Sequence, residues 1–118
     1  PENKISLLES NNKKCYFLKK VSYELNLKNT KIINQTITKK NKLGRFDIIT
    51  SRAFATIEKT INLTKTNTHE NTKYLLLKGK ASNIKKELKD IDKNMFRYEI
   101  INQDTTKERN IVLLCKDE

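Results

Sequence analysis

Residues 46–55 have the sequence Phe46-Asp47-Ile48-Ile49-Thr50-Ser51-Arg52-Ala53-Phe54-Ala55. The first half, Phe46 to Thr50, is apolar enough to predict a central strand of a sheet. From Phe54 onward, apolar residues recur at helical spacing through Ile57 and Ile61. A strand that leads through a short polar turn into a helix is typical of an α/β fold.

Toward the N-terminus, the same alternation of strand and helix recurs. The apolar run Ile5 to Leu8 predicts a buried strand that ends in polar turn residues. A helix follows over Asn12 to Leu25, with Asn11 or Asn12 as its N-cap. Lys31 to Gln35 predicts a second strand, before a basic loop that leads to Phe46. The apolar stripe of the helix consists of Cys15, Leu18, Val21 and Leu25.

Toward the C-terminus, Thr64 to Thr72 is rich in Thr and Asn and predicts a loop without core residues. Tyr74 to Leu77 predicts a fourth strand, and Ala81 to Lys89 a weak helix. The strand-like runs Phe96 to Asn102 and Asn110 to Cys115 then predict an antiparallel hairpin. The whole order indicates an α/β protein with a mostly parallel sheet and an antiparallel strand at one edge.

The glycine pattern is unusual for such a fold. Parallel α/β sheets bind ligands at the carboxyl ends of their strands, and a glycine-rich turn after the first strand lets the backbone approach the ligand. This sequence has only two glycines, Gly44 and Gly79, neither in a GxGxG array. The strand before Glu9 resembles the second strand of nucleotide-binding folds, whose terminal carboxylate binds ribose hydroxyls. We therefore expect that the first strand and its glycine-rich loop are missing from the sequence.

Composition limits the classes of function. The formal net charge of +11 favours a polyanionic partner such as nucleic acid, although an AT-rich genome would also enrich Lys. Two cysteines and one histidine predict no metal site, and we expect reduced cysteines in a cytoplasmic protein. No signal-peptide pattern follows Pro1, and no apolar stretch approaches the roughly 20 residues of a membrane span.

Several motifs together resemble one family. Leu7-Leu8-Glu9-Ser10, Phe46-Asp47, Ser51-Arg52-Ala53-Phe54-Ala55 and Leu76-Leu77-Lys78-Gly79-Lys80 occur in the order and approximate spacing of the glucose-inhibited division protein B family, the ribosomal RNA small-subunit methyltransferase G group. The Ser-Arg-Ala-Phe block is the most specific of these motifs. The resemblance covers essentially the whole chain, as the C-terminal portion of such a protein.

The resemblance implies a class I methyltransferase (Rossmann-like) fold, of which residues 1–118 form a partial domain. It implies methyl transfer from S-adenosylmethionine to N7 of a guanine in 16S ribosomal RNA, by a monomer that acts on the small ribosomal subunit. The catalytic residues stay unknown, and this chemistry requires no general base, because the sulfonium is already an activated methyl donor and guanine N7 has no proton to remove. The family has Glu at the position of Thr38, and this chain departs from the family there. The cofactor-binding residues that the resemblance implies are Glu9, Ser10, Asn11, Ile37, Thr38 and Arg52.

Other interpretations of the same residues stay open. Glu9 is also interpretable as a solvated carboxylate, and Arg52 as a partner of Asp47. Phe17, Phe54 and Tyr74 are interpreted as core residues and not as stacking platforms for RNA. The alternative function is a non-catalytic, basic RNA- or ribosome-binding remnant of such an enzyme; a third is an α/β domain without nucleic-acid binding. Four lysines at predicted carboxyl ends of strands are candidates to face RNA, or are ordinary solvated lysines: Lys13, Lys14, Lys78 and Lys80.

Overall fold

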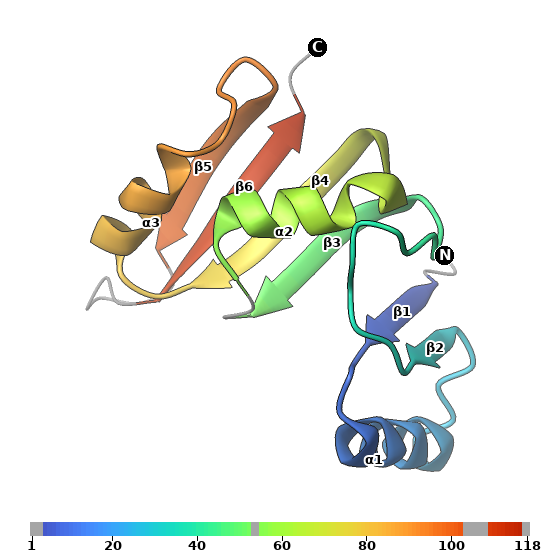
Figure 1. The fold of residues 1–118 in the computed structure, drawn as a ribbon. Coiled ribbons are helices and arrows are strands. Elements are labelled where there is room, and N and C mark those ends of the chain that lie inside the picture. The colour runs from blue at the N-terminus through green and yellow to red at the C-terminus, as the bar shows by residue number, and fades with distance from the viewer. Residues whose placement is uncertain (1–3, 53–54, 103–108, 117–118) are drawn as a thin grey trace. The chain divides into compact units, whose positions relative to one another are not determined.

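The computed structural model describes residues 4–52, 55–102 and 109–116 (Figure 1). The chain forms two compact units, Pro1–Thr38 and Lys39–Glu118. The boundary falls in the basic loop that the sequence predicts before Phe46.

The first unit is a strand–helix–strand arrangement. Strand β1 (Ile5–Leu8) pairs in parallel with β2 (Thr30–Ile33), and helix α1 (Asn12–Glu24) connects them. Cys15 on α1 and Ile33 on β2 are its buried apolar side chains. Because the two strands are parallel, the residues that follow them, Glu9 and Asn34, lie at the same edge of the pair.

Both ends of α1 are fixed by local hydrogen bonds. The Asn11 side chain accepts a hydrogen bond from the backbone N–H of Lys14 at 3.0 Å, as an N-cap does. At the other end, Asn26 has a positive φ of 55°, and the N–H groups of Asn26 and Leu27 donate to the carbonyls of Tyr23 and Ser22. This pattern is a Schellman motif, in which Asn takes the left-handed position that Gly usually occupies.

The second unit is a mixed sheet with helices on one face. Its strands are β3 (Phe46–Arg52), β4 (Thr68–Lys78), β5 (Phe96–Asn102) and β6 (Asn110–Lys116). Helix α2 (Ile57–Thr64) and the short 3-10 helix η1 (Lys65–Asn67) connect β3 to β4, and α3 (Ala81–Leu88) follows β4. The strand order is β3-β4-β6-β5.

The position of the reversed strand differs from the expectation. The β5–β6 pair is antiparallel, as predicted, but β6 also pairs antiparallel with β4. The reversed strand is therefore inside the sheet, and β5 takes the edge with the same direction as β3 and β4. The apolar pattern of β6 explains this placement: Val112 and Leu114 are fully buried, whereas most residues of β5 are exposed. Among the described residues β3 is at the other edge and not central.

The core of the second unit lies between the sheet and its two helices. Figure 1 shows α2 and α3 on one face of the four strands. On β4 and β6, buried side chains alternate with more exposed ones, as expected when one face of a sheet is covered. The buried core residues of the strands, the helices and the segment after α3 are Ile57, Ile61, Tyr74, Leu76, Ile84, Leu88, Ile91, Phe96, Val112 and Leu114.

The Thr-rich stretch 64–72 is not the coreless loop that its composition predicts. It completes α2, forms η1 and begins β4. Thr64 and Thr72 are buried, because their hydroxyls have partners: Thr64 shares a 2.7 Å hydrogen bond with the Tyr74 hydroxyl, and Thr72 donates to the Phe46 carbonyl at 2.6 Å. Burial raises the pKa of Tyr74, and the hydrogen bond with the Thr64 hydroxyl partly offsets this.

Of the three aromatic residues that the sequence predicts in the core, one is buried, one is exposed and one lies outside the described residues. Tyr74 is fully buried and packs edge-on against Phe96, with ring centroids 6.3 Å apart, so that prediction is confirmed. The prediction for Phe17 is wrong, since its side chain is 63% exposed on α1. Leu25 is also exposed, because α1 ends at Glu24 and Leu25 is its C-cap. Phe54 lies outside the described residues.

Candidate functional site

The edge of the first unit where β1 and β2 end carries the predicted cofactor contacts. Glu9 follows β1 directly, and its backbone N–H donates to the carbonyl of Ile33 at 3.0 Å, which extends the parallel pairing by one residue. The buried Cys15 thiol donates to the Glu9 carbonyl at 3.0 Å. Glu9 is thus held by both its N–H and its carbonyl.

The Glu9 side chain is 27% exposed. One oxygen, Oε2, accepts from the backbone N–H of Ser10 at 3.0 Å, and the other, Oε1, lies 3.9 Å from the Lys14 ammonium. A carboxylate has about four lone-pair positions. Two of them therefore stay available for further hydrogen-bond donors.

Ser10 and Asn11 form the turn between β1 and α1. Both are exposed, and Asn11 is committed to capping α1 through its side chain. Asn34, which follows β2, donates to the Asn12 side chain at 2.7 Å and joins the end of β2 to the start of α1. Ser10 is thus the residue of this turn that presents a hydroxyl at the edge.

Ile37 and Thr38 follow β2 by four and five residues, within the same unit. Ile37 is half-buried and Thr38 is exposed. Thr38 also takes part in an interaction within the protein. The structure therefore puts five of the six predicted cofactor-binding residues in one unit, and Glu9, Ser10 and Asn11 in one turn.

Arg52 is the last residue of β3, in the second unit, and it is exposed. The alternative that it pairs with Asp47 is wrong: Asp47 lies near the opposite end of β3 and contacts His69 Nε2 at 2.7 Å. His69 Nδ1 accepts from the Asn71 N–H at 3.0 Å, so Nε2 carries the proton that is donated to Asp47. This His–Asp pair joins the first residues of β3 to the first residues of β4.

Lys78, at the end of β4, faces inward. Its side chain is only 10% exposed, and its ammonium lies 3.1 Å from Glu87 Oε1 on α3 and donates to the carbonyl of Ala55. Glu87 Oε1 also accepts from the Ile57 N–H at 2.9 Å. We call Lys78 and Glu87 the clamp, because together they hold both ends of the turn that joins Ala55 to α2.

Because Lys78 is part of the clamp, we interpret it differently from the other three lysines that the sequence predicts to face RNA. Its ammonium has two partners inside the protein, whereas Lys13, Lys14 and Lys80 are exposed. Sequence reasoning missed Glu87 as its partner, because the two residues lie on different elements. The available signal was the single carboxylate within the basic α3 sequence, Ala81 to Leu88.

In the ranges that the structure describes, no three His, Cys, Asp or Glu side chains group in a way that could hold a metal ion. Cys15 and Cys115 are both free thiols. The helices found within those ranges are all too short or too polar to cross a bilayer.

Comparison with known proteins identifies the family. The model of the rRNA small subunit methyltransferase G family matches residues 1–112. The protein of that name from Brachyspira hyodysenteriae is 36% identical over 118 aligned residues, which cover 96% of this chain and 56% of the relative. The one from Mycoplasma capricolum is 39% identical over 97 residues, 80% of this chain and 42% of the relative. The chain thus spans about half the length of these relatives.

Solved structures show the same fold at low identity. An rRNA methylase from Streptococcus thermophilus superposes with a TM-score of 0.71 at 9% identity, over 98% of this chain and 74% of that one. A Streptococcus mutans protein described as a methyltransferase, in complex with SAH, gives 0.68 at 13% identity, over 97% and 76%. The fold is that of the class I methyltransferases, and, since the family model matches nearly all of its sequence, the chain belongs to the rRNA small subunit methyltransferase G family.

Proposed function

We propose that these 118 residues form part of a class I methyltransferase domain that transfers a methyl group from S-adenosylmethionine to N7 of a guanine in 16S ribosomal RNA. The observation that carries this proposal is Glu9, fixed at the carboxyl edge of a parallel strand pair with free acceptor positions. The names of the relatives support the class of substrate. The SAH bound to the Streptococcus mutans protein supports the class of cofactor.

The residues at this edge fit the ribose of an adenosyl group. The Glu9 carboxylate is an acceptor for two vicinal hydroxyls, which is how an acidic residue after a strand recognises ribose in nucleotide-binding folds. The Ser10 N–H donates to this carboxylate, and the Cys15 thiol holds the Glu9 backbone through its carbonyl. Ser10, Asn11, Ile37, Thr38 and Arg52 complete the proposed contacts, with Thr38 contributing a hydroxyl where the family has a carboxylate.

The proposed chemistry asks little of side chains as acids or bases. When bound, S-adenosylmethionine supplies a methyl group on a sulfonium that is already activated. Guanine N7 has an in-plane lone pair and no proton to lose, so no general base is needed. The role of the protein is then to align donor and acceptor and to exclude water. The absence of a catalytic triad among the sequence motifs agrees with this requirement.

RNA is the proposed partner of the basic surface. The exposed Lys13 and Lys14 follow β1 in the first unit, and the exposed Lys80 follows β4 in the second unit. We propose that these lysines contact phosphates. Within the second unit, Lys78 supports the end of β4 from inside, through the clamp. We also propose that the protein acts as a monomer in the cytoplasm, where ribosomal subunits are modified.

A calorimetric titration with S-adenosylmethionine tests the cofactor part of the proposal. The chain should release or absorb heat on binding, and Glu9→Gln should weaken binding about tenfold, because a charged acceptor becomes neutral. Glu70→Gln is the matched control, since Glu70 is an exposed carboxylate on β4. Equal affinity of the Glu9→Gln variant and the parent chain would contradict the assignment of Glu9.

The alternative function is RNA binding without cofactor, and Thr38 is the observation that favours it. A chain that binds RNA in a salt-dependent manner but gives no heat with S-adenosylmethionine would support this alternative. Methyl transfer to 16S ribosomal RNA, measured with labelled cofactor, would decide against it.

A further inference from the structure

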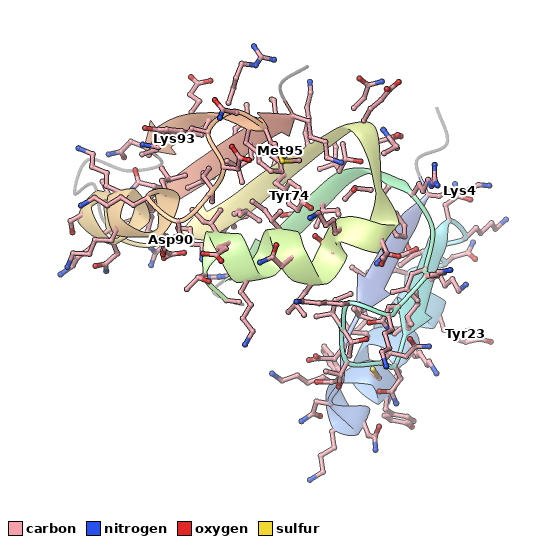
Figure 2. The ribbon with its side chains drawn as sticks, turned by 45° about the horizontal axis from the view of Figure 1, so that its top comes forward. Lys4, Tyr23, Tyr74, Asp90, Lys93 and Met95 are labelled. Carbon is pink, nitrogen blue, oxygen red and sulfur yellow. The ribbon has the colours of Figure 1, made fainter. Side chains whose placement is uncertain are left out.

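The outer face of α1 carries exposed aromatic rings between lysines. Tyr16 and Tyr23 are 72% and 86% exposed, and they are seven residues apart, so they lie on the same face two turns from each other. Figure 2 shows Tyr23 projecting outward from the ribbon. Lys19 and Lys20 are exposed between the two rings. Large rings of this kind usually contribute to a core or an interface, so their exposure calls for a partner.

A hollow adjoins this face where α1 ends. It has a volume of about 680 Å³ and is lined by both apolar and polar side chains of α1 and of the segment that leads to β2. Tyr23 and Leu27 provide apolar surface, and Ser22 and Asn26 provide hydrogen-bonding groups. The charged residues that line the hollow are two cations and one carboxylate: Lys19, Lys28 and Glu24.

The backbone around the hollow is held by short-range hydrogen bonds. The Leu27 N–H donates to the Ser22 carbonyl at 2.9 Å, and the Asn26 N–H to the Tyr23 carbonyl at 3.1 Å. These bonds of the Schellman motif keep the backbone of Ser22, Tyr23 and Asn26 in a fixed arrangement. The backbone beside the hollow is therefore ordered before a partner binds, which lowers the entropic cost of binding.

We propose that this hollow and the outer face of α1 bind unpaired nucleotides of RNA, with one base against the Tyr23 ring and the next against Tyr16. Lys19 and Lys28 meet the phosphate of the first nucleotide, and Lys20 that of the second. Ser22 and Asn26 offer donors and acceptors to the edge of the first base. The choice of RNA as partner rests on the proposed function.

Charge and chemistry favour a nucleic acid over a protein segment. Helix α1 has four lysines, Lys13, Lys14, Lys19 and Lys20, against one acidic residue, Glu24. Aromatic rings interleaved with cations match the alternation of bases and phosphates along a single strand. A duplex does not fit, because its bases are stacked on one another and unavailable to Tyr23. The site is thus expected to prefer loops, bulges and ends.

The test is fluorescence anisotropy with a labelled single-stranded oligoribonucleotide, and with a duplex of the same length, titrated with the full 118-residue chain. Tyr23→Leu keeps apolar bulk but removes the ring, and it should weaken single-strand binding by about 5- to 150-fold, the range for loss of one stacked base. Tyr23→Phe should bind as the parent does. The double change Lys19→Gln and Lys28→Gln should reduce the slope of log affinity against log salt by about 0.7, for the one phosphate that the two lysines share.

Tyr98→Leu is the matched control, because Tyr98 is an exposed tyrosine on β5 in the other unit. It should leave affinity within about twofold. The proposal is overturned if Tyr23→Leu and Tyr98→Leu bind equally, if duplex RNA binds as well as the single strand, or if the parent chain binds no RNA. Circular dichroism confirms that each variant keeps its helix content.

These measurements need no S-adenosylmethionine, so the inference and the proposed function fail separately. Loss of single-strand binding in Tyr23→Leu upholds the site even where no methyl transfer occurs. Methyl transfer that is unchanged in Tyr23→Leu, with unchanged RNA affinity, removes the site but leaves the enzyme.

Discussion

Removal of Glu87 tests whether the clamp supports the edge that carries Arg52. In Glu87→Ala, the Lys78 ammonium loses its ion-pair partner at 3.1 Å, and the Ile57 N–H loses its acceptor at 2.9 Å. The Lys78 side chain is 10% exposed and that of Glu87 is 23% exposed, so water replaces these partners only in part. The Lys78 ammonium then keeps one protein acceptor, the Ala55 carbonyl.

The magnitude follows from this partial burial. Loss of one partner of a buried ion pair costs about 3–5 kcal/mol, and loss of an exposed pair costs about 0–1 kcal/mol. The clamp lies between these limits, and the unpaired Ile57 amide adds about 1 kcal/mol. We therefore expect Glu87→Ala to lower the free energy of unfolding by about 3 kcal/mol in total. For a chain of 118 residues this lowers Tm by about 12 °C, at about 4 °C per kcal/mol.

Thermal and urea unfolding, followed by far-UV circular dichroism, measure the effect. A double-mutant cycle with Lys78→Met isolates the pair, and the coupling free energy should reach about 1–2 kcal/mol. Glu70→Ala, at an exposed carboxylate, should change stability by less than about 0.5 kcal/mol. Strict additivity of Glu87→Ala and Lys78→Met, or a Tm within about 2 °C of the parent for Glu87→Ala, would refute the reasoning.

Two further predictions concern the two units. The pKa of Tyr74 in the folded chain is raised above its usual 10.0. Above pH 10.0 the folded chain therefore keeps the phenol proton that the unfolded chain loses. The contribution of the protonated Tyr74 to the free energy of unfolding is full below pH 10.0 and is lost as pH rises through the folded pKa. Tyr74→Phe should therefore remove part of the fall in stability above pH 10.0, and an unchanged alkaline slope in urea titrations would contradict this. Asn11→Ala should destabilise α1 by about 1 kcal/mol through loss of its N-cap, with Asn11→Ser close to the parent; equal helix ellipticity at 222 nm in all three during urea titration would count against the cap.

Local chemistry predicted much of the fold. The order of strands and helices, the N-cap at Asn11 and the position of Glu9 after β1 all depend on residues near each other in the sequence. The parallel pairing of β1 with β2 follows from the helix that connects them. The edge at which Glu9 lies could therefore be predicted, because strand direction alone determines it.

Long-range partners could not be predicted in the same way. The hydrogen bond from Thr72 to Phe46 joins residues 26 apart, and it makes a polar residue a buried one. Composition alone predicted a loop there, since Thr and Asn are common in loops. The insertion of β6 between β4 and β5 likewise depends on pairing that a hairpin pattern does not specify. Sequence patterns give periods and turns, but the choice of partner strand is decided by tertiary packing.

The exposure of the aromatic residues of α1 could have been predicted from the sequence, and the prediction for Phe17 is wrong for an identifiable reason. At about 100° per residue, the stripe Cys15, Leu18 and Val21 defines the inner face of the helix. Phe17 lies about 100° from the centre of that stripe, and Tyr16 and Tyr23 lie almost opposite to it. The prediction of a core role for Phe17 is based on helical spacing, whereas its angular position relative to the apolar stripe predicts exposure. Exposed rings on the polar face of a basic helix are better explained by a partner with flat, apolar surfaces and negative charge, which is the chemistry of a single-stranded nucleic acid.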